Sequence, residues 1–288
     1  KEGDFCLGFA GDTYNTAWYL ARLRPDFEVS YFTAVGDDDI SHRMLTAFDA
    51  AGIRRSHVLQ IWGRSVGLYM ISLKNGERSF SYWRGQSAAR NLADYREPLQ
   101  NAINEADFIY FSGITLAILS PEGRDQLLAV LHDARASGRL VAFDPNLRPS
   151  LWRSPEEMTD IIMRGAAVSD IVLPSFEDEA VWFKDASPKE TLTRYSQAGA
   201  QTVVVKNGPN PVLATSDERF SSCPVEALDA VVDTTAAGDS FNAGVFAHLL
   251  EAPLEHSIDA ACRLASHVVQ SRGALIPFDP ADYQLNLT

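Results

Sequence analysis

Cysteine is scarce in this 288-residue sequence, which contains only Cys6, Cys223 and Cys262. An odd number this small does not support a disulfide framework. The sequence has no C-x-x-C pair and no H-E-x-x-H segment, so we expect no zinc site. No apolar run reaches the roughly 18 residues that a membrane span requires. These absences predict a cytoplasmic protein with reduced cysteines and no membrane partner.

Basic residues are outnumbered, because 25 Lys and Arg stand against 38 Asp and Glu and give a formal net charge of −13. Nucleic acids and anionic membranes attract clustered Lys and Arg, so this balance argues against both as partners. A small anionic substrate is still compatible with it, because a few local arginines can dominate the field of a pocket. The length allows one large α/β domain or two small ones.

Short apolar runs alternate with segments of helical period along most of the chain. The expected strands are Val29–Ala34, Phe108–Ser112, Leu140–Asp144, Ile171–Leu173, Val203–Lys206 and Val231–Asp233. The expected helices are Thr13–Leu23, Ser41–Ala51, Pro121–Ala136, Pro155–Ala167, Pro188–Ala198, Ser240–Leu250 and Glu255–Ser271. Several strands are apolar throughout, as in parallel sheets covered on both faces. The alternation predicts a three-layer α/β fold with a mainly parallel central sheet.

One stretch departs from this alternation and predicts a β-hairpin. Ser65–Lys74 and Glu77–Arg84 are extended runs joined by Asn75-Gly76, a strong signal for a tight hairpin turn. Such a hairpin could form a lid over an active site, or it could simply extend the sheet at its edge. The aromatic and basic run Tyr82-Trp83-Arg84 at its end favours the lid.

The segment from Asp233 to Gly244 carries the clearest chemical signal, because small residues here separate an apolar run from a helix. Backbone N–H groups at the start of a helix are unpaired and favour anions. Small side chains let a phosphate approach the backbone closely. Asp239 at this point could accept the proton of an attacking hydroxyl. Its alternative role is that of an ordinary N-terminal helix cap.

This segment resembles the second signature of the PfkB (ribokinase-like) carbohydrate kinases, and Ala10 to Ala17 resembles the first signature of that family. The sequence contains neither G-x-x-x-x-G-K-[ST] nor G-x-G-x-x-G, the motifs of other nucleotide-binding folds. The resemblance implies one ribokinase-like kinase domain over residues 1–288, with a lid at about residues 65–84.

Within the family, the chain is most similar to kinases of 2-keto-3-deoxygluconate over nearly its whole length. The matching pieces are Phe9 to Thr13, Gly76 to Arg78, Tyr82 to Arg84, Ser112 to Ile114, Asp144 to Trp152 and Gly273 to Pro277. The implied activity is transfer of the ATP γ-phosphoryl group to this keto sugar acid. The alternatives are a family kinase for fructose, ribose or 5-dehydro-2-deoxygluconate, and a sugar-acid-binding regulator that lacks catalysis.

The resemblance assigns roles to individual residues. The catalytic residues would be Asp239, as the base, and Arg148, and the anion hole would be Ala236, Ala237 and Gly238. The sugar acid would contact Gly11, Asp12, Thr13, Tyr14, Asn15, Tyr69, Tyr82, Trp83, Arg84, Arg148 and Asp239. ATP would contact Asn146, Leu147, Arg148, Lys206, Asn207, Gly208, Pro209, Asn210, Pro211, the anion hole and Asp239.

The arginines fit anionic ligands for a physical reason. A guanidinium recognises a carboxylate bidentately, and we expect Arg84 to bind the carboxylate of the substrate. Arg148 could reach the transferring phosphoryl oxygens, where charge develops. The alternatives are a solvated surface cation for Arg84 and a structural salt bridge for Arg148.

The resemblance also implies Mg²⁺, which ATP phosphates and waters would largely ligate. The family's Asn-x-x-Glu element is replaced here, and its spacing falls on Ser175 and Asp178. Asp178 or Glu179 would assist the metal, unless this acidic run is only the solvated first turn of a helix. The resemblance leaves room for a monovalent cation.

Two further expectations concern assembly and the start of the chain. Hairpin edges often pair between subunits, so we expect a homo-oligomer. Nothing before Phe5 can form the strand that precedes the first signature in such kinases. We expect a further upstream segment of roughly 20 residues, enough for one strand and its connection.

Overall fold

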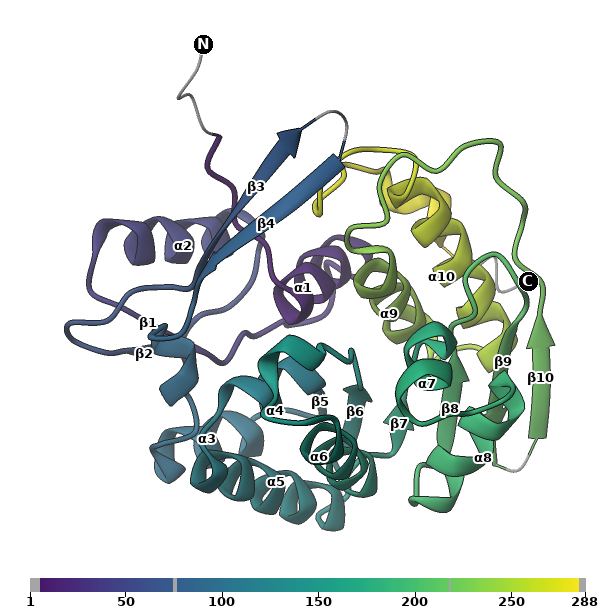
Figure 1. Ribbon diagram of the computed structural model, residues 1–288, viewed down its shortest axis with the longest axis horizontal. Coiled ribbons are helices and arrows are strands. Elements are labelled where there is room, and N and C mark those ends of the chain that lie inside the picture. Colours follow the sequence, from purple (N-terminus) through teal and green to yellow (C-terminus); the bar gives the residue numbers. More distant parts are fainter. Residues whose placement is uncertain (1–5, 75–76, 218, 285–288) are drawn as a thin grey trace. The chain divides into compact units, whose positions relative to one another are not determined.

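A mainly parallel sheet of six strands organises the larger part of the chain (Figure 1). The structure is a computed structural model that describes residues 6–74, 77–217 and 219–284. It divides into two compact units, which we call the helical unit and the sheet unit. The helical unit comprises Lys1–Val29, Met44–Arg54 and Val225–Thr288, and the sheet unit comprises Ser30–Arg43 and Arg55–Pro224. The single domain expected from the sequence stays a prediction.

The six strands of the central sheet lie next to one another in the order in which they occur along the chain. They are β5 (Phe108–Ser112), β6 (Leu140–Asp144), β7 (Ile171–Val172), β8 (Thr202–Val205), β9 (Val212–Ser216) and β10 (Arg219–Cys223). Their order in the sheet is β10-β9-β8-β7-β6-β5. Strands β5 to β8 run parallel, and β9 and β10 continue the sheet antiparallel. The predicted α/β fold with a mainly parallel sheet is thus confirmed.

Helices precede and separate the parallel strands, as the alternating sequence pattern predicts. They are α3 (Arg96–Asn104), α4 (Gly113–Ile118), α5 (Pro121–Ala136), α6 (Pro155–Ala167), α7 (Phe176–Trp182) and α8 (Pro188–Gln197), with short 3₁₀ turns at Ala88–Asn91 and Pro149–Leu151. Helices α5, α6 and α8 each begin with a Ser-Pro pair, at Ser120, Ser154 and Ser187. Each serine hydroxyl accepts a backbone N–H of the first turn, and proline fits the next position because that N–H has no partner within the helix.

The core of the sheet unit lies on these parallel strands. Phe111 of β5 stacks on Phe143 of β6 with ring centroids 4.6 Å apart. A β-carbon at Gly113 would lie 1.9 Å from the carbonyl oxygen of Pro145, so only glycine allows the chain to leave β5 here. The carboxyl ends of β5 and β6 are thereby held close together.

Two small two-stranded sheets complete the sheet unit. Strand β1 (Ala34–Val35) runs parallel to β2 (Leu59–Gln60). Strand β3 (Leu68–Lys74) pairs antiparallel with β4 (Glu77–Trp83), so the predicted hairpin is confirmed. Its turn, Asn75-Gly76, lies outside the described residues, and its role as a lid stays a prediction.

The helical unit is built from α1 (Asp12–Leu23), α9 (Ala237–His248), α10 (Leu254–Val268), a 3₁₀ turn at Pro280–Tyr283 and the later part of α2 (Asp39–Ala50). Helices α9 and α10 lie side by side (Figure 1). A β-carbon at Gly244 would lie 2.6 Å from Cα of Ala261, which shows how closely the two backbones approach. The buried Tyr19 hydroxyl donates to the carbonyl of Ala274 and accepts from the amide of Ile276, both at 2.9 Å.

Two strand predictions were wrong. Val231–Asp233 is a loop whose amides at Val232 and Asp233 both donate to the carbonyl of Val269, and the Val231 and Val232 side chains are exposed. Of Val29–Ala34, only Ala34 enters a regular strand, β1. A run of apolar residues does not say whether a neighbouring strand is available to pair with it. The described part of the chain contains no helix that is long and apolar enough to span a membrane.

Candidate active site

The two signature segments meet inside the helical unit, at the first turns of α1 and α9. The amide Nδ2 of Asn15 donates to Oδ2 of Asp239 at 2.7 Å. The hydroxyl of Thr16 donates to the backbone carbonyl of Asp239 at 3.1 Å. Both Asn15 and Thr16 are buried, so these contacts are shielded from competing water. The Asp239 carboxylate therefore has a fixed orientation at the start of a helix, where the helix dipole favours negative charge.

The turn before α9 is unusual, because Ala236 adopts the left-handed conformation with φ 60° and ψ 14°. This region costs a residue with a β-carbon about 1 kcal/mol. Asp233 stabilises the turn, since its carboxylate accepts from the amide and hydroxyl of Thr235 and from the amide of Gly273. The amide of Ala237 donates to the carbonyl of Thr234 at 3.2 Å, so Ala236 and Gly238 are the better candidates for anion-hole donors.

Replacing Ala236 with Gly should relieve this strain. We expect the free energy of unfolding to rise by up to about 1 kcal/mol, because glycine adopts the left-handed region without penalty. The matched control is Ala129→Gly at an exposed interior position of α5, which should cost about 1 kcal/mol. Urea unfolding measures both changes. A loss for Ala236→Gly as large as that of the control would contradict the strain.

The other residues of the first signature divide between surface and core. Gly11 caps the start of α1, and its amide donates to Oδ1 of Asn15 at 3.2 Å. Asp12 and Thr13 are partly exposed in the first turn of the helix. The ring of Tyr14 is buried against Phe48, with centroids 5.1 Å apart, and burial raises its pKa. This packing speaks against the predicted contact of Tyr14 with a sugar.

In the sheet unit, charged residues gather at the carboxyl ends of β6 and β8, which is where α/β sheets bind ligands. Nζ of Lys206 pairs with Oδ2 of Asp144 at 2.8 Å, and both side chains are nearly buried. The neighbouring backbone fixes this pair, because the amide of Asn146 donates to Oδ1 of Asp144. Asn146 itself has a positive φ of 34°. Such a conformation at a strand end often marks a functional site.

Arg148 and Leu147 follow Asn146 and have different environments. The Leu147 side chain belongs to the buried core, so its predicted contact with ATP can involve only the backbone. Nη1 of Arg148 donates to the carbonyl of Leu147 at 2.7 Å and lies 3.8 Å from Oδ2 of Asp178. The Arg148 side chain is half exposed, and such a long, exposed ion pair contributes little stability. Arg148 thus keeps the freedom to bind an anion.

Asp178 and Glu179, the two candidates to assist the metal, lie in very different surroundings. Asp178 is partly exposed near Arg148, and burial raises its pKa while Arg148 opposes the rise. Glu179 is fully buried, and both of its oxygens accept hydrogen bonds from Tyr195. Ser175 pairs with Lys206 in an isolated β-bridge at the end of β7. Asp178 is therefore the better candidate to meet a metal.

The donor set fits a metal that is held mainly by nucleotide phosphates. Mg²⁺ bound with ATP needs only one or two protein carboxylates, and Asp178 can supply one. Across residues 6–74, 77–217 and 219–284, no three His, Cys, Asp or Glu side chains gather as a metal site.

The predicted nucleotide loop follows Lys206 directly. The amide of Asn210 donates to the carbonyl of Asn207 at 3.0 Å, and Gly208 has a positive φ of 55°. Residues Asn207 to Pro211 are largely exposed and form a tight turn between β8 and β9. The turn can therefore present its backbone to a ligand.

The hairpin carries the remaining predicted substrate residues. Tyr69 and Tyr82 are cross-strand partners whose ring centroids lie 6.2 Å apart. The guanidinium of Arg84 lies 4.4 Å from the ring centroid of Tyr82, an arrangement that holds the arginine by cation–π attraction. Tyr82 and Trp83 are exposed. An anion approaching this end of the hairpin would meet a preorganised guanidinium.

Three residues that the sequence analysis left without a role emerge here. Asp144 pairs with Lys206, Asp233 holds the turn before α9, and Thr16 contacts Asp239. Asp144 ends a predicted strand, so its position at the carboxyl edge of a parallel sheet was a usable signal. The contacts of Thr16 with Asp239 and of Asp233 with Gly273 join segments that lie far apart in the sequence, which no local pattern reports.

Comparisons with known proteins identify the family of this chain. A family model described as pfkB family carbohydrate kinase matches residues 1–281. The chain belongs to this family of carbohydrate kinases, which confirms the resemblance of its two signature segments.

Within this family, the chain is similar to several individual proteins. The 2-dehydro-3-deoxygluconokinase of Dickeya dadantii is 38% identical over 97% of this chain and 93% of its own length. The enzyme of the same name from Escherichia coli K12 is 37% identical over 96% and 93%. A PfkB protein from Polaromonas sp. JS666 has a crystal structure with a TM-score of 0.79 and 28% identity, covering 91% of this chain and 85% of that one. The 2-dehydro-3-deoxygluconokinase structure from Thermotoga maritima, at 18% identity over 98% and 90% of the two chains, shares the fold with a TM-score of 0.85.

Proposed function

We propose that this protein transfers the γ-phosphoryl group of ATP to a hydroxyl of 2-dehydro-3-deoxygluconate, the same compound as 2-keto-3-deoxygluconate. The observation that carries the proposal is the Asp239 carboxylate, fixed by Asn15 at the start of α9. This arrangement brings the proposed base together with the first signature segment, which would bind the sugar acid. The names of relatives at 37–38% identity support the choice of substrate.

The reaction needs a proton acceptor and donors for phosphate charge. Asp239 accepts the hydroxyl proton while the substrate oxygen forms a bond to the γ-phosphorus, and the bond to the bridging oxygen breaks to release ADP. The amides of Ala236 and Gly238 hold the developing negative charge. Positioning dominates in such a loose transition state, so an ionised carboxylate suffices as the base. Mg²⁺, when bound with ATP, neutralises phosphate charge.

The residues of the sheet unit would serve the two anionic ligands. Lys206 and Arg148 provide cations for the nucleotide phosphates, and Asp178 would assist the metal. Arg84 provides the bidentate partner for the substrate carboxylate. Tyr69 and Tyr82 would flank the sugar acid from the hairpin. A monovalent cation, for which the family resemblance leaves room, and a homo-oligomeric state, expected from the edges of the hairpin, remain part of this proposal.

An assay of ATP consumption against a panel of sugars tests the proposal. The panel contains 2-dehydro-3-deoxygluconate, 5-dehydro-2-deoxygluconate, fructose and ribose. We expect the first to give the highest kcat/KM. Higher turnover on fructose would instead support the alternative that relatives named fructokinase, at 30% and 27% identity, represent. No ATP consumption on any of the four would contradict the kinase proposal itself.

Replacing Arg84 with Ala tests the recognition of the carboxylate. We expect kcat/KM for the keto acid to fall about 10- to 100-fold, the value of a lost charge-assisted hydrogen-bond pair. Activity on a neutral sugar should change less than about threefold, because no carboxylate is involved. The control is Arg96→Ala, which removes an exposed arginine of the same unit. Equal losses on charged and neutral substrates would reject the role of Arg84.

A further inference from the structure

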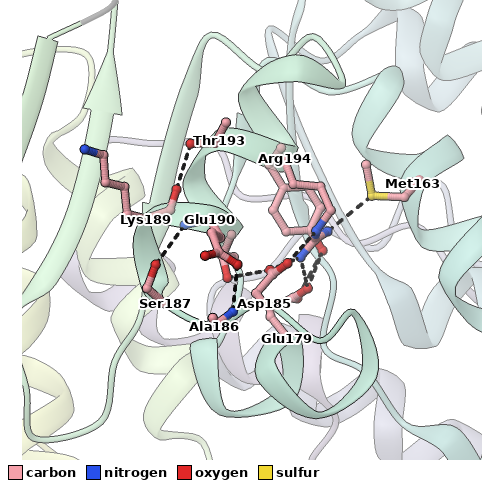
Figure 2. Close-up of polar contacts among 11 residues, drawn as sticks. Met163, Glu179, Asp185, Ala186, Ser187, Lys189, Glu190, Thr193 and Arg194 are labelled. Carbon is pink, nitrogen blue, oxygen red and sulfur yellow. Dashed lines mark hydrogen bonds and ion pairs between the residues drawn. The ribbon is translucent and has the colours of Figure 1, made fainter.

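Glu179 belongs to a buried cluster of charges between α7 and α8 (Figure 2). Its carboxylate is fully buried and accepts from the Tyr195 hydroxyl at 3.0 and 3.1 Å. Nη2 of Arg194 donates to Oε2 of Glu179 at 2.7 Å and to Oδ2 of Asp185 at 2.5 Å. Asp185 also accepts from the hydroxyl of Thr191 at 2.7 Å. One guanidinium thus joins two carboxylates.

Aromatic and sulfur contacts immobilise the guanidinium at the centre of this cluster. Arg194 lies 3.7 Å from the ring centroid of Phe183 and 4.4 Å from that of Tyr195. Its Nη1 also contacts the sulfur of Met163 at 3.3 Å (Figure 2). Together with the two carboxylates, these three neighbours fix the position of the guanidinium. The arginine can hold Glu179 in a single position.

A contribution to the stability of the fold does not by itself explain why these charges are buried together. Removing a carboxylate and a guanidinium from water costs several kcal/mol per ion, and apolar residues of similar volume often stabilise as well or better. The best-supported use of buried charge is to specify one arrangement among several that apolar packing would allow. The arrangement specified here is the rotation of α7 about its own axis.

That rotation decides where Asp178 points, because consecutive residues on a helix lie about 100° apart around its axis. Helix α7 has only seven residues and one fully buried side chain, Glu179. Its start is tied to the residue that follows β8, because the amide of Phe176 donates to the carbonyl of Lys206 at 2.8 Å. Glu179 of α7 is held by Arg194 and Tyr195 of α8. In this orientation of α7, the side chain of Asp178 is directed towards Arg148.

We propose that Glu179 is a positioning residue, held by Arg194 and Tyr195, that orients α7 so that Asp178 meets the metal ion carried by the nucleotide phosphates. The inference rests on the proposed kinase function. It assigns to Glu179 an indirect role, whereas Asp178 makes the contact.

The test is a double-mutant cycle on the binding of Mg·ATP in the absence of sugar, measured by calorimetry. Glu179→Gln keeps the volume but weakens the ion pair with Arg194, and we expect Mg·ATP to bind about tenfold more weakly, as for other residues that orient metal ligands. In the Asp178→Asn background the same substitution should have less than about a twofold effect, because its target is gone. Glu177→Gln, exposed on the same helix, is the matched control.

The possible results of this experiment distinguish the positioning role of Glu179 from the kinase proposal. An equal effect of Glu179→Gln in both backgrounds overturns the positioning role, as does unchanged binding in the single variant. Absence of Mg·ATP binding in the unmodified protein contradicts the kinase proposal instead, so the two failures are distinguishable. If urea unfolding shows that Glu179→Gln does not fold, Tyr195→Phe replaces it in both backgrounds. It removes only the hydroxyl that contacts both Glu179 oxygens, and the same coupling to Asp178 is required.

Discussion

Replacing Asp239 with Asn should lower kcat by about two to four orders of magnitude, the usual contribution of a general base. The amide cannot accept the proton of the attacking hydroxyl. Its oxygen can still accept from Nδ2 of Asn15, so the local structure should survive. The affinity for the sugar acid should therefore change only a few-fold. Steady-state kinetics measure the first effect, and calorimetric titration of the keto acid measures the second.

The control for this substitution is Asp259→Asn on α10, where an exposed aspartate pairs with Arg263 on the surface. It removes the same charge from the same unit and should leave kcat within about twofold, since exposed pairs contribute little. Circular dichroism shows whether both variants are folded. An Asp239→Asn protein that retains more than about a tenth of the wild-type kcat would reject the assignment of the base.

The sequence predicted helices α5 and α6 and the helix that carries Asp239 because local rules operate there. Helices α5 and α6 begin and end where the sequence indicates, at Pro121–Ala136 and Pro155–Ala167. Serine caps with a following proline mark the starts, and in α5 a glycine follows the end of the helix. The contact between Asn15 and Asp239 could be anticipated only from the resemblance of both segments to one family.

Local sequence rules could not decide which of Asp178 and Glu179 is available to a metal. Both are carboxylates in one acidic run, and either satisfies a spacing argument. Their different environments depend on Arg194 and Tyr195, which lie on another helix and reach α7 only in the folded protein. Tyr14 shows the same limit, since the next residue, Asn15, contacts Asp239 while the ring of Tyr14 faces Phe48. Long-range packing, rather than residue type, decides these cases.

Replacing Lys206 with Met should have the largest effect on stability. The substitution leaves the Asp144 carboxylate, whose side chain is only 5% exposed, without its cation. Removing one partner of a buried ion pair costs about 3–5 kcal/mol, because the remaining charge is stranded in a medium of low dielectric constant. Urea unfolding should show a loss of this size. Lys189→Met, at an exposed position of α8, is the control and should change the free energy of unfolding by less than about 0.5 kcal/mol.

The double variant Asp144→Asn/Lys206→Met separates structural and functional roles of the pair. Neutralising Asp144 removes the stranded charge, so the double variant should regain at least half of the lost stability. Binding of ATP should stay weakened in both, because the cation for the phosphates is missing from each. A double variant no more stable than Lys206→Met would show that the buried charge is not the cause of the loss. Full ATP affinity in the double variant would show that Lys206 serves the fold and not the nucleotide.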